Sequence, residues 1–163
     1  MKVLVVVGTH EQQFDRLVNA ADQLSLSGHE VFVQYGASGA PSSAAGEPLV
    51  DRTRLDRLMD EADVIITHGG PGTIWQAFEH GKHPIVVPRR RSFGEHVDDH
   101  QLAFARRLAA SRRVVLVDEI DQLPTALRTH PTVSATLKLP QHGVSANRLA
   151  VKRKLDLWLL GSS

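Results

Sequence analysis

The segment His68-Gly69-Gly70-Pro71-Gly72-Thr73 combines residue types that could bind a phosphate group. It follows an apolar run at 62–67 that is typical of a buried strand. It precedes apolar residues at helical spacing, so we expect a helix to begin here. Free N–H groups and the positive end of the dipole at a helix start attract anions. Thr73 could cap this helix or donate its hydroxyl to the same phosphate.

The same residues could be no more than a tight turn between a strand and a helix, because one glycine-rich loop is a weak signal. No Gly-Lys-Ser/Thr sequence follows, so the segment is not a Walker loop. The dinucleotide-binding fingerprint would be expected at the first strand of a sheet rather than here. On its residues alone, the turn leaves both interpretations open.

A second polar segment, residues 89–101, follows the apolar run 84–88 and concentrates charge after a predicted strand. Its arginines could pair with a phosphate or a carboxylate. Asp99 and Gln101 could bind sugar hydroxyls; alternatively, the segment is a solvated loop in which an aspartate caps the next helix. Its histidines and aspartates match no known spacing of metal ligands, so we predict no metal site.

Two further side chains are candidates for a site. His10 follows the first predicted strand and could act as a base, although a lone histidine in a loop is more often inert. Gln76 lies one turn into the helix after the glycine-rich turn, where it could reach a ribose or face solvent.

Alternating strand-like and helix-like segments would position these residues. Apolar strands are predicted at 3–7, 31–35, 62–67, 84–88 and 114–117, and helices at 14–24, 55–59, 74–78, 97–110, 120–127 and 145–160. Such a pattern predicts an α/β fold with a parallel sheet covered on both faces. Ligands of these sheets bind at the carboxyl ends of the strands, where the candidate residues fall. Residues 36–48 are predicted to form a mobile loop.

Composition limits the class of protein. The chain has 163 residues, enough for one domain, and a net charge of +1, which gives no indication of nucleic-acid binding. It contains no cysteine, which excludes disulfides and thiolate metal sites. No apolar run reaches membrane-spanning length, and the short apolar start has no cleavage pattern of a signal peptide. We therefore expect a cytoplasmic protein.

The residues 62–73, followed by Gly81, 86–88 and 99–101, resemble the C-terminal half of a GT-B glycosyltransferase, and more narrowly glycosyltransferase family 28. The resemblance covers roughly residues 1–128 and implies a Rossmann-like doubly wound sheet that binds a nucleotide-sugar donor. Residues 129–144 are then an irregular linker, and 145–163 form a C-terminal helix. That helix could dock on a partner or pack on its own domain.

The resemblance also implies roles for individual residues. Gly69, Gly70, Gly72 and Thr73 would contact the diphosphate, with His68 beside it. Gln76 stands where many members of the family have a ribose-binding glutamate. Asp99 and Gln101 match contacts to the donor sugar. The set of substrate-binding residues is completed by Gly8 and Thr9, after the first strand.

A complete GT-B enzyme has two such domains, so this chain resembles the donor subunits that work with a separate membrane-anchored acceptor subunit. The expected reaction is transfer of a sugar from a UDP-sugar, with inversion, to a polyprenyl-linked saccharide, without a metal or cofactor. The chain would then lie at the inner face of the membrane through its partner.

The segment 93–101 is closest to the bacterial exopolysaccharide or capsule type. The catalytic base is expected on the partner, with His10 as the local candidate.

A non-catalytic nucleotide-sugar binding or regulatory module is an alternative function. A nucleotide-sugar epimerase is a third possibility, against which the missing first domain argues. A homodimer is also possible.

Overall fold

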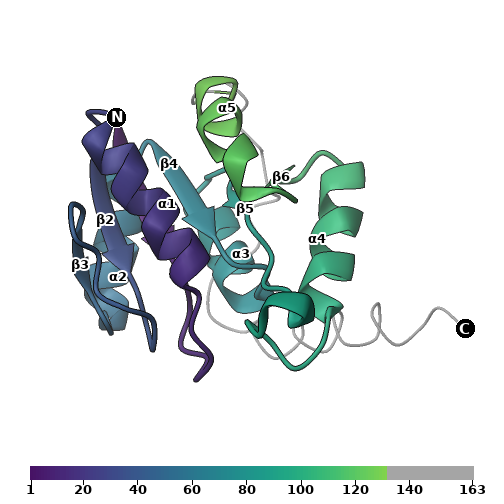
Figure 1. Ribbon diagram of the computed structural model, residues 1–163. Helices are drawn as coiled ribbons and strands as arrows, with labels where there is room; N and C mark the ends of the chain where they lie inside the picture. Colours follow the sequence, from purple (N-terminus) through teal and green to yellow (C-terminus); the bar gives the residue numbers. More distant parts are fainter. Residues whose placement is uncertain (132–163) are drawn as a thin grey trace, which may run out of the picture.

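The computed structural model describes residues 1–131 (Figure 1). Most of the predicted linker, 129–144, and the whole predicted C-terminal helix, 145–163, lie outside the described residues. The strands are β1 (Lys2–Val6), β2 (Glu30–Gln34), β3 (Ala45–Glu47), β4 (Val64–Thr67), β5 (Ile85–Val86) and β6 (Val115–Leu116). The helices are α1 (Asp15–Leu26), α2 (Arg52–Glu61), α3 (Pro71–Glu79), α4 (His100–Ala110) and α5 (Leu123–Arg128), with 3-10 turns η1 (Arg91–Phe93) and η2 (Ile120–Gln122).

The six strands form one sheet in the order β3-β2-β1-β4-β5-β6, and every neighbouring pair is parallel. The chain therefore winds outward from β1 in one direction and then from β4 in the other. The predicted α/β, doubly wound parallel sheet is confirmed. In such a sheet a crevice opens at the carboxyl ends of the two central strands, because their following segments leave toward opposite faces.

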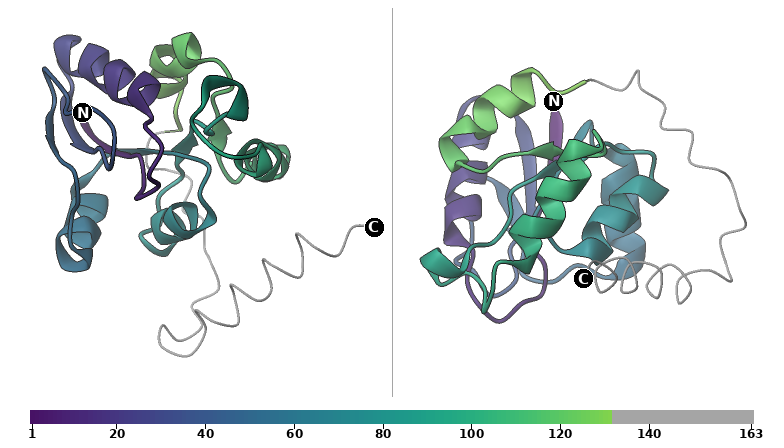
Figure 2. Two further views of the ribbon diagram at one scale, coloured as in Figure 1. Left: turned by 60° about the horizontal axis from the view of Figure 1, so that its bottom comes forward. Right: turned by 90° about the vertical axis from the view of Figure 1, so that its right-hand side faces the viewer.

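Both faces of the sheet are covered by helices, as Figure 2 shows. Alternate side chains of β1 supply the two faces: Val3 and Val5 pack with α1 and α5, whereas Leu4 and Val6 pack with α2 and α3. A further cluster joins α3 and α4 through Phe78 and Phe104. The uninterrupted apolar strands in the sequence follow from burial on both sides.

The predicted loop at 36–48 is wrong for residues 45–47, which pair with β2 as strand β3. The sequence Ala45-Gly46-Glu47 does not alternate apolar and polar residues, so its pattern does not predict a strand. The buried carboxylate of Asp22 in α1 accepts the N–H groups of Ser42, Ser43 and Ala44. Burial alone would raise the pKa of Asp22, but these three donors lower it below its ordinary value.

Helix boundaries differ from the predictions in two functional places. Helix α4 begins at His100 rather than at 97, because Asp98 turns the chain by accepting the N–H of His100 at 3.0 Å. Helix α3 begins at Pro71 rather than at Ile74, so the proline occupies the first turn, where its missing N–H costs nothing. Figure 1 shows that the loops after β1 and β5 leave the sheet at the same, lower end.

Candidate functional site: a cleft at the carboxyl ends of β1 and β4

A cleft of about 260 Å³ lies where the order of the strands reverses. It brings together residues after β1 with residues at the start of α3. The predicted site residues in its lining are Gly8, Thr9, His68, Gly70, Gly72 and Thr73. Leu49, Val50 and Leu55, which were not predicted, supply an apolar side of the same cleft.

The start of α3 offers unpaired N–H groups to this cleft. Gly70 is the N-cap residue and makes no side-chain capping bond, and Pro71 has no N–H. The first intrahelical bond of this turn runs from Ile74 N–H to Gly70 O at 3.2 Å. The N–H groups of Gly72 and Thr73 therefore have no partner within the helix. Thr73 lies inside the helix, so the interpretation of this residue as its cap is wrong.

The imidazole of His68 lies between two glycines at the base of the cleft. A Cβ added to Gly8 would stand 2.6 Å from the His68 ring, and one added to Gly70 would stand 2.2 Å from its Nε2. Nδ1 lies 3.3 Å from the carbonyl oxygen of Val6, which can only accept, so Nδ1 carries the proton. Nε2 of the neutral ring is then an acceptor.

Burial lowers the pKa of His68 from 6.5 to about 4, because the surrounding protein disfavours the charged ring. The bond to Val6 opposes this shift, while electrostatic repulsion from neighbouring basic side chains, the Arg89 guanidinium first, adds to it. His68 is therefore uncharged at neutral pH. A neutral histidine with such a low pKa is a weak base.

Gln34 at the end of β2 holds the first loop in place, a role that sequence reasoning missed. Its side chain is buried, accepts the Gly8 N–H at 3.0 Å and donates to the Gly8 carbonyl at 3.1 Å. It also donates to Pro48 O at 2.8 Å. The sequence signal that could have indicated this role is the polar residue Gln34 in the otherwise apolar predicted strand 31–35.

Gln101, in the first turn of α4, and Asp99, the N-cap residue of that helix, both lie outside the lining of the cleft. Gln101 packs on Gly69, where an added Cβ would stand 2.7 Å from the Gln101 Cβ. It also accepts the Arg89 N–H at 3.3 Å. Asp99 accepts the Arg91 N–H at 3.0 Å and is exposed. Gln101 is thus beside the glycine-rich turn, whereas Asp99 shapes its own loop.

The remaining predicted residues have other neighbours. The Gln76 amide donates to Asp56 of α2 at 2.9 Å. His10 accepts the Gln12 N–H at 3.2 Å, and its ring centroid lies 4.7 Å from that of His96. Neither side chain lines the cleft, so their roles toward a ribose or as a base stay predictions.

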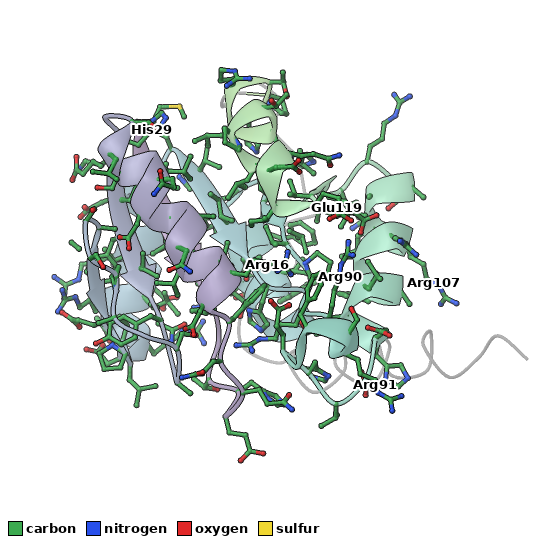
Figure 3. All side chains as sticks on the ribbon, viewed as in Figure 1. Arg16, His29, Arg90, Arg91, Arg107 and Glu119 are labelled. Carbon is green, nitrogen blue, oxygen red and sulfur yellow. The ribbon has the colours of Figure 1, made fainter. Side chains whose placement is uncertain are left out.

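The three arginines at 89–91 do not act together as an anion site. Arg89 is only 1% exposed, and its guanidinium donates to four backbone carbonyls, of residues Gln12, Gln13, Glu95 and Val7. Arg90 donates to Asp118 and Glu119. Figure 3 shows Arg16 and Arg90 between α1 and α4, with Arg91 pointing outward. Arg89 is therefore not accessible to a phosphate, and Arg90 pairs with carboxylates of the protein itself.

Within residues 1–131, no group of three or more histidines, aspartates or glutamates is arranged to hold a metal ion. The same part of the chain contains no helix that is long and apolar enough to cross a membrane.

A parallel sheet with this strand order, and with an open helix start at its reversal point, defines a Rossmann-like domain. The sequence matches the glycosyltransferase family 28 C-terminal domain over residues 2–143, and the chain belongs to this family. Its fold is that of one half of a GT-B glycosyltransferase.

The UDP-N-acetylglucosamine transferase subunit ALG13 of Yarrowia lipolytica is 27% identical over 125 residues, which are 75% of this chain and 60% of that protein. Two solved structures share the fold. MurG of Acinetobacter baumannii has a TM-score of 0.55 at 23% identity, covering 78% of this chain and 41% of its own. The glycosyltransferase SsfS6 of Streptomyces sp. SF2575, complexed with thymidine diphosphate, has a TM-score of 0.55 at 20% identity, covering 98% and 37%. The chain thus spans less than two thirds of each of these proteins.

Proposed function

We propose that the chain is the donor-binding subunit of a glycosyltransferase. It binds a UDP-sugar and, with a membrane-anchored partner chain, transfers the sugar with inversion to a lipid-linked saccharide. The observation that carries the proposal is the start of α3, where the unpaired N–H groups of Gly72 and Thr73 open into a cleft. Among the described residues, the lining of this cleft contains no carboxylate that would repel a diphosphate.

The two sides of the cleft suit the two ends of a nucleoside diphosphate. The diphosphate lies against the N–H groups and the hydroxyl of Thr73, where the helix dipole favours negative charge. The apolar side chains of Leu49, Val50 and Leu55 offer a surface for a flat base. The sugar then extends toward Gly69 and Gln101.

In the proposed reaction the acceptor hydroxyl oxygen bonds to the anomeric carbon as the bond from that carbon to the diphosphate oxygen breaks. The N–H groups at the start of α3 stabilise the charge that develops on the departing UDP. The proton of the hydroxyl must pass to a base. His68 is too weak a base for this step, which supports a base on the partner chain and leaves His10 as the local candidate.

The same observation favours one second candidate. A cleft that binds the donor but whose described lining offers no effective base also suits a non-catalytic nucleotide-sugar binding module. Turnover by the chain together with its partner, but not by the partner alone, distinguishes the transferase from this module.

The finer features of the proposal rest on resemblance. The ALG13 subunit is by its name part of a UDP-N-acetylglucosamine transferase, which supports a UDP-sugar donor and a second subunit. The segment 93–101 supports an acceptor on a polyprenyl carrier of the bacterial exopolysaccharide type. A partner in the membrane would keep this chain at its cytoplasmic face.

The donor site is tested by the thermal stability of the chain with UDP, UDP-sugars, GDP-sugars and ADP-sugars. A ligand at a hundred times its dissociation constant adds about 2.7 kcal/mol to the free energy of unfolding. Gly72→Leu is the matched variant, because a Cβ at Gly72 meets nothing within 4 Å. We expect UDP compounds to stabilise the wild-type chain and to leave this variant unchanged.

Equal stabilisation of the wild-type chain and Gly72→Leu would remove the start of α3 from the site. If UDP compounds stabilise neither the chain nor its complex with the partner, the donor assignment is wrong.

A further inference from the structure

A second, larger cavity of about 440 Å³ lies on the other side of the loop that follows β1. The start of α1 forms one wall and the loop after β5 forms the other. Its lining includes Gln12, Gln13, Asp15, Arg16, Phe93 and Glu95. It shares no lining residue with the donor cleft.

Hydrogen bonds within the protein hold the charged side chains at the floor of this cavity. Arg16 forms a two-pronged ion pair with Glu95, with Nε–Oε1 and Nη2–Oε2 distances of 2.9 Å. Glu95 is 5% exposed and also accepts the Arg90 N–H at 3.0 Å. These bonds leave a rigid floor whose charges are already matched.

An aromatic ring stands open above this floor. Phe93 is 55% exposed, and the guanidinium carbons of Arg16 and Arg90 lie 5.1 and 5.6 Å from its centroid. The two cation–π contacts hold the ring in place although solvent reaches it. A fixed, exposed ring beside a cavity offers a flat apolar surface to a ligand.

The amides of the loop after β1 are available to such a ligand. Within residues 1–131, neither Gln12 nor Gln13 makes a side-chain hydrogen bond, and Gln12 Oε1 is shielded from solvent without a partner. Each amide can both donate and accept. A ligand hydroxyl can therefore bond to the exposed amide of Gln13 without displacing a bond within the protein.

The charge of the lining indicates the class of ligand. The carboxylates of Asp15 and Glu95 outnumber the single guanidinium of Arg16, so a phosphate or another anion is disfavoured. An open ring with neutral amides and one accessible carboxylate suits a neutral sugar, which has apolar ring faces and many hydroxyls.

Arg89 binds both of the loops that frame the second cavity, one of which also lines the donor cleft. From beneath, it donates to Val7 and Gln12 on the loop after β1 and to Glu95 on the loop after β5. Both cavities lie at the carboxyl ends of the strands of one sheet. The loop after β1, which Arg89 holds through its bonds to Val7 and Gln12, separates them.

We propose that this cavity binds a neutral sugar ring of the acceptor saccharide, so that this chain contributes to acceptor recognition as well as to donor binding. That the bound saccharide is the acceptor rests on the proposed function. The existence of a saccharide site rests only on the cavity and its lining residues. Phe93 stacks on the sugar ring, and Gln12, Gln13 and Asp15 bind its hydroxyls.

The test is an NMR titration of the full chain with methyl β-glycosides of glucose, galactose and N-acetylglucosamine. We expect at least one glycoside to shift the side-chain amide signals of Gln12 and Gln13, with a millimolar dissociation constant. Phe93→Ala should weaken this binding at least tenfold. Val97→Ala, which changes another exposed apolar residue of the same loop outside the cavity lining, should leave it unchanged.

A UDP titration of the same samples separates this proposal from the proposed function. Wild type and Phe93→Ala should bind UDP equally. No glycoside shifts at roughly 50 mM, or shifts that persist in Phe93→Ala, would overturn the saccharide site. Glycoside binding by a chain that binds no UDP, either alone or with its partner, would uphold the cavity and refute the donor assignment.

Discussion

At the scale of single residues, the glycines around the cleft have different roles. Gly8 and Gly70 are required by the His68 ring that lies on them, and Gly69 by Gln101. Gly72 alone in the turn has open space at its Cβ position. The sequence indicated the glycine-rich turn as a site, but it could not assign these roles. Each depends on a side chain that folds back from elsewhere in the structure.

Gly8→Ala should destabilise the fold more than Gly28→Ala. Both glycines have positive φ, +84° and +90°, so both substitutions strain the backbone by about 1 kcal/mol. At Gly8 the new Cβ also meets the His68 ring at 2.6 Å, whereas at Gly28 it meets nothing within 4 Å. We expect an additional loss of about 1–3 kcal/mol at Gly8, measured by urea denaturation. Equal losses at the two positions would contradict the described packing of His68.

His68 should make the fold sensitive to mild acid. Its pKa is about 4 in the folded chain and 6.5 in its ordinary environment, so between these values the unfolded chain binds the proton. The free energy of unfolding therefore falls as the pH decreases from 6.5 to 4, by up to about 3 kcal/mol from this group.

His68→Asn retains an N–H donor toward Val6 and should remove this part of the pH dependence. Asp22 and His130, whose pKa values are also lowered, contribute in the same direction in both proteins, so the difference between the two curves isolates His68. Parallel curves for wild type and His68→Asn would show that the ring is not held in its neutral form.

At the scale of elements, the loops after β1 and β5 are held by residues that sequence patterns did not reveal. The positions of these loops followed from the alternation of strands and helices. Gln34 and Arg89, however, come at the ends of apolar strands, where they could equally face solvent. Their bonds run to backbone carbonyls and N–H groups, which carry no signature in the sequence.

Arg89→Met should cost at least about 3 kcal/mol of stability, because it leaves several buried carbonyls without a donor. Methionine keeps much of the side-chain length without any donor. Arg91→Met is the matched control, at an exposed arginine two residues along the chain, and should change the free energy of unfolding by less than about 0.5 kcal/mol. Chemical denaturation of both variants measures the difference. A similar small loss at the two positions would contradict the role assigned to Arg89.

At the scale of the whole molecule, the sequence predicted the sheet and its parallel strands well, because burial on both faces leaves a strong apolar pattern. It missed β3, which pairs through its backbone and depends on Asp22 to hold the preceding residues. It placed most of the candidate residues at the carboxyl edge. It could not show that Gln76 turns toward α2, because Asp56 lies 20 residues away in the chain.

The order of strands explains why one edge of the molecule carries both cavities. Outward winding from β1 and β4 leaves a crevice between their carboxyl ends, and the adjacent loops after β1 and β5 frame the second cavity. Family membership and this geometry together support a donor-binding half of a glycosyltransferase.

The central claim, that the start of α3 binds the diphosphate of a UDP-sugar, is tested most directly by the backbone amide signals of the full chain during titration with UDP. We expect the largest shifts at Gly72 and Thr73, because their N–H groups would gain charged acceptors. Uridine, which lacks phosphate, should not produce these shifts. Saturable UDP binding that leaves both amides unchanged would contradict the account.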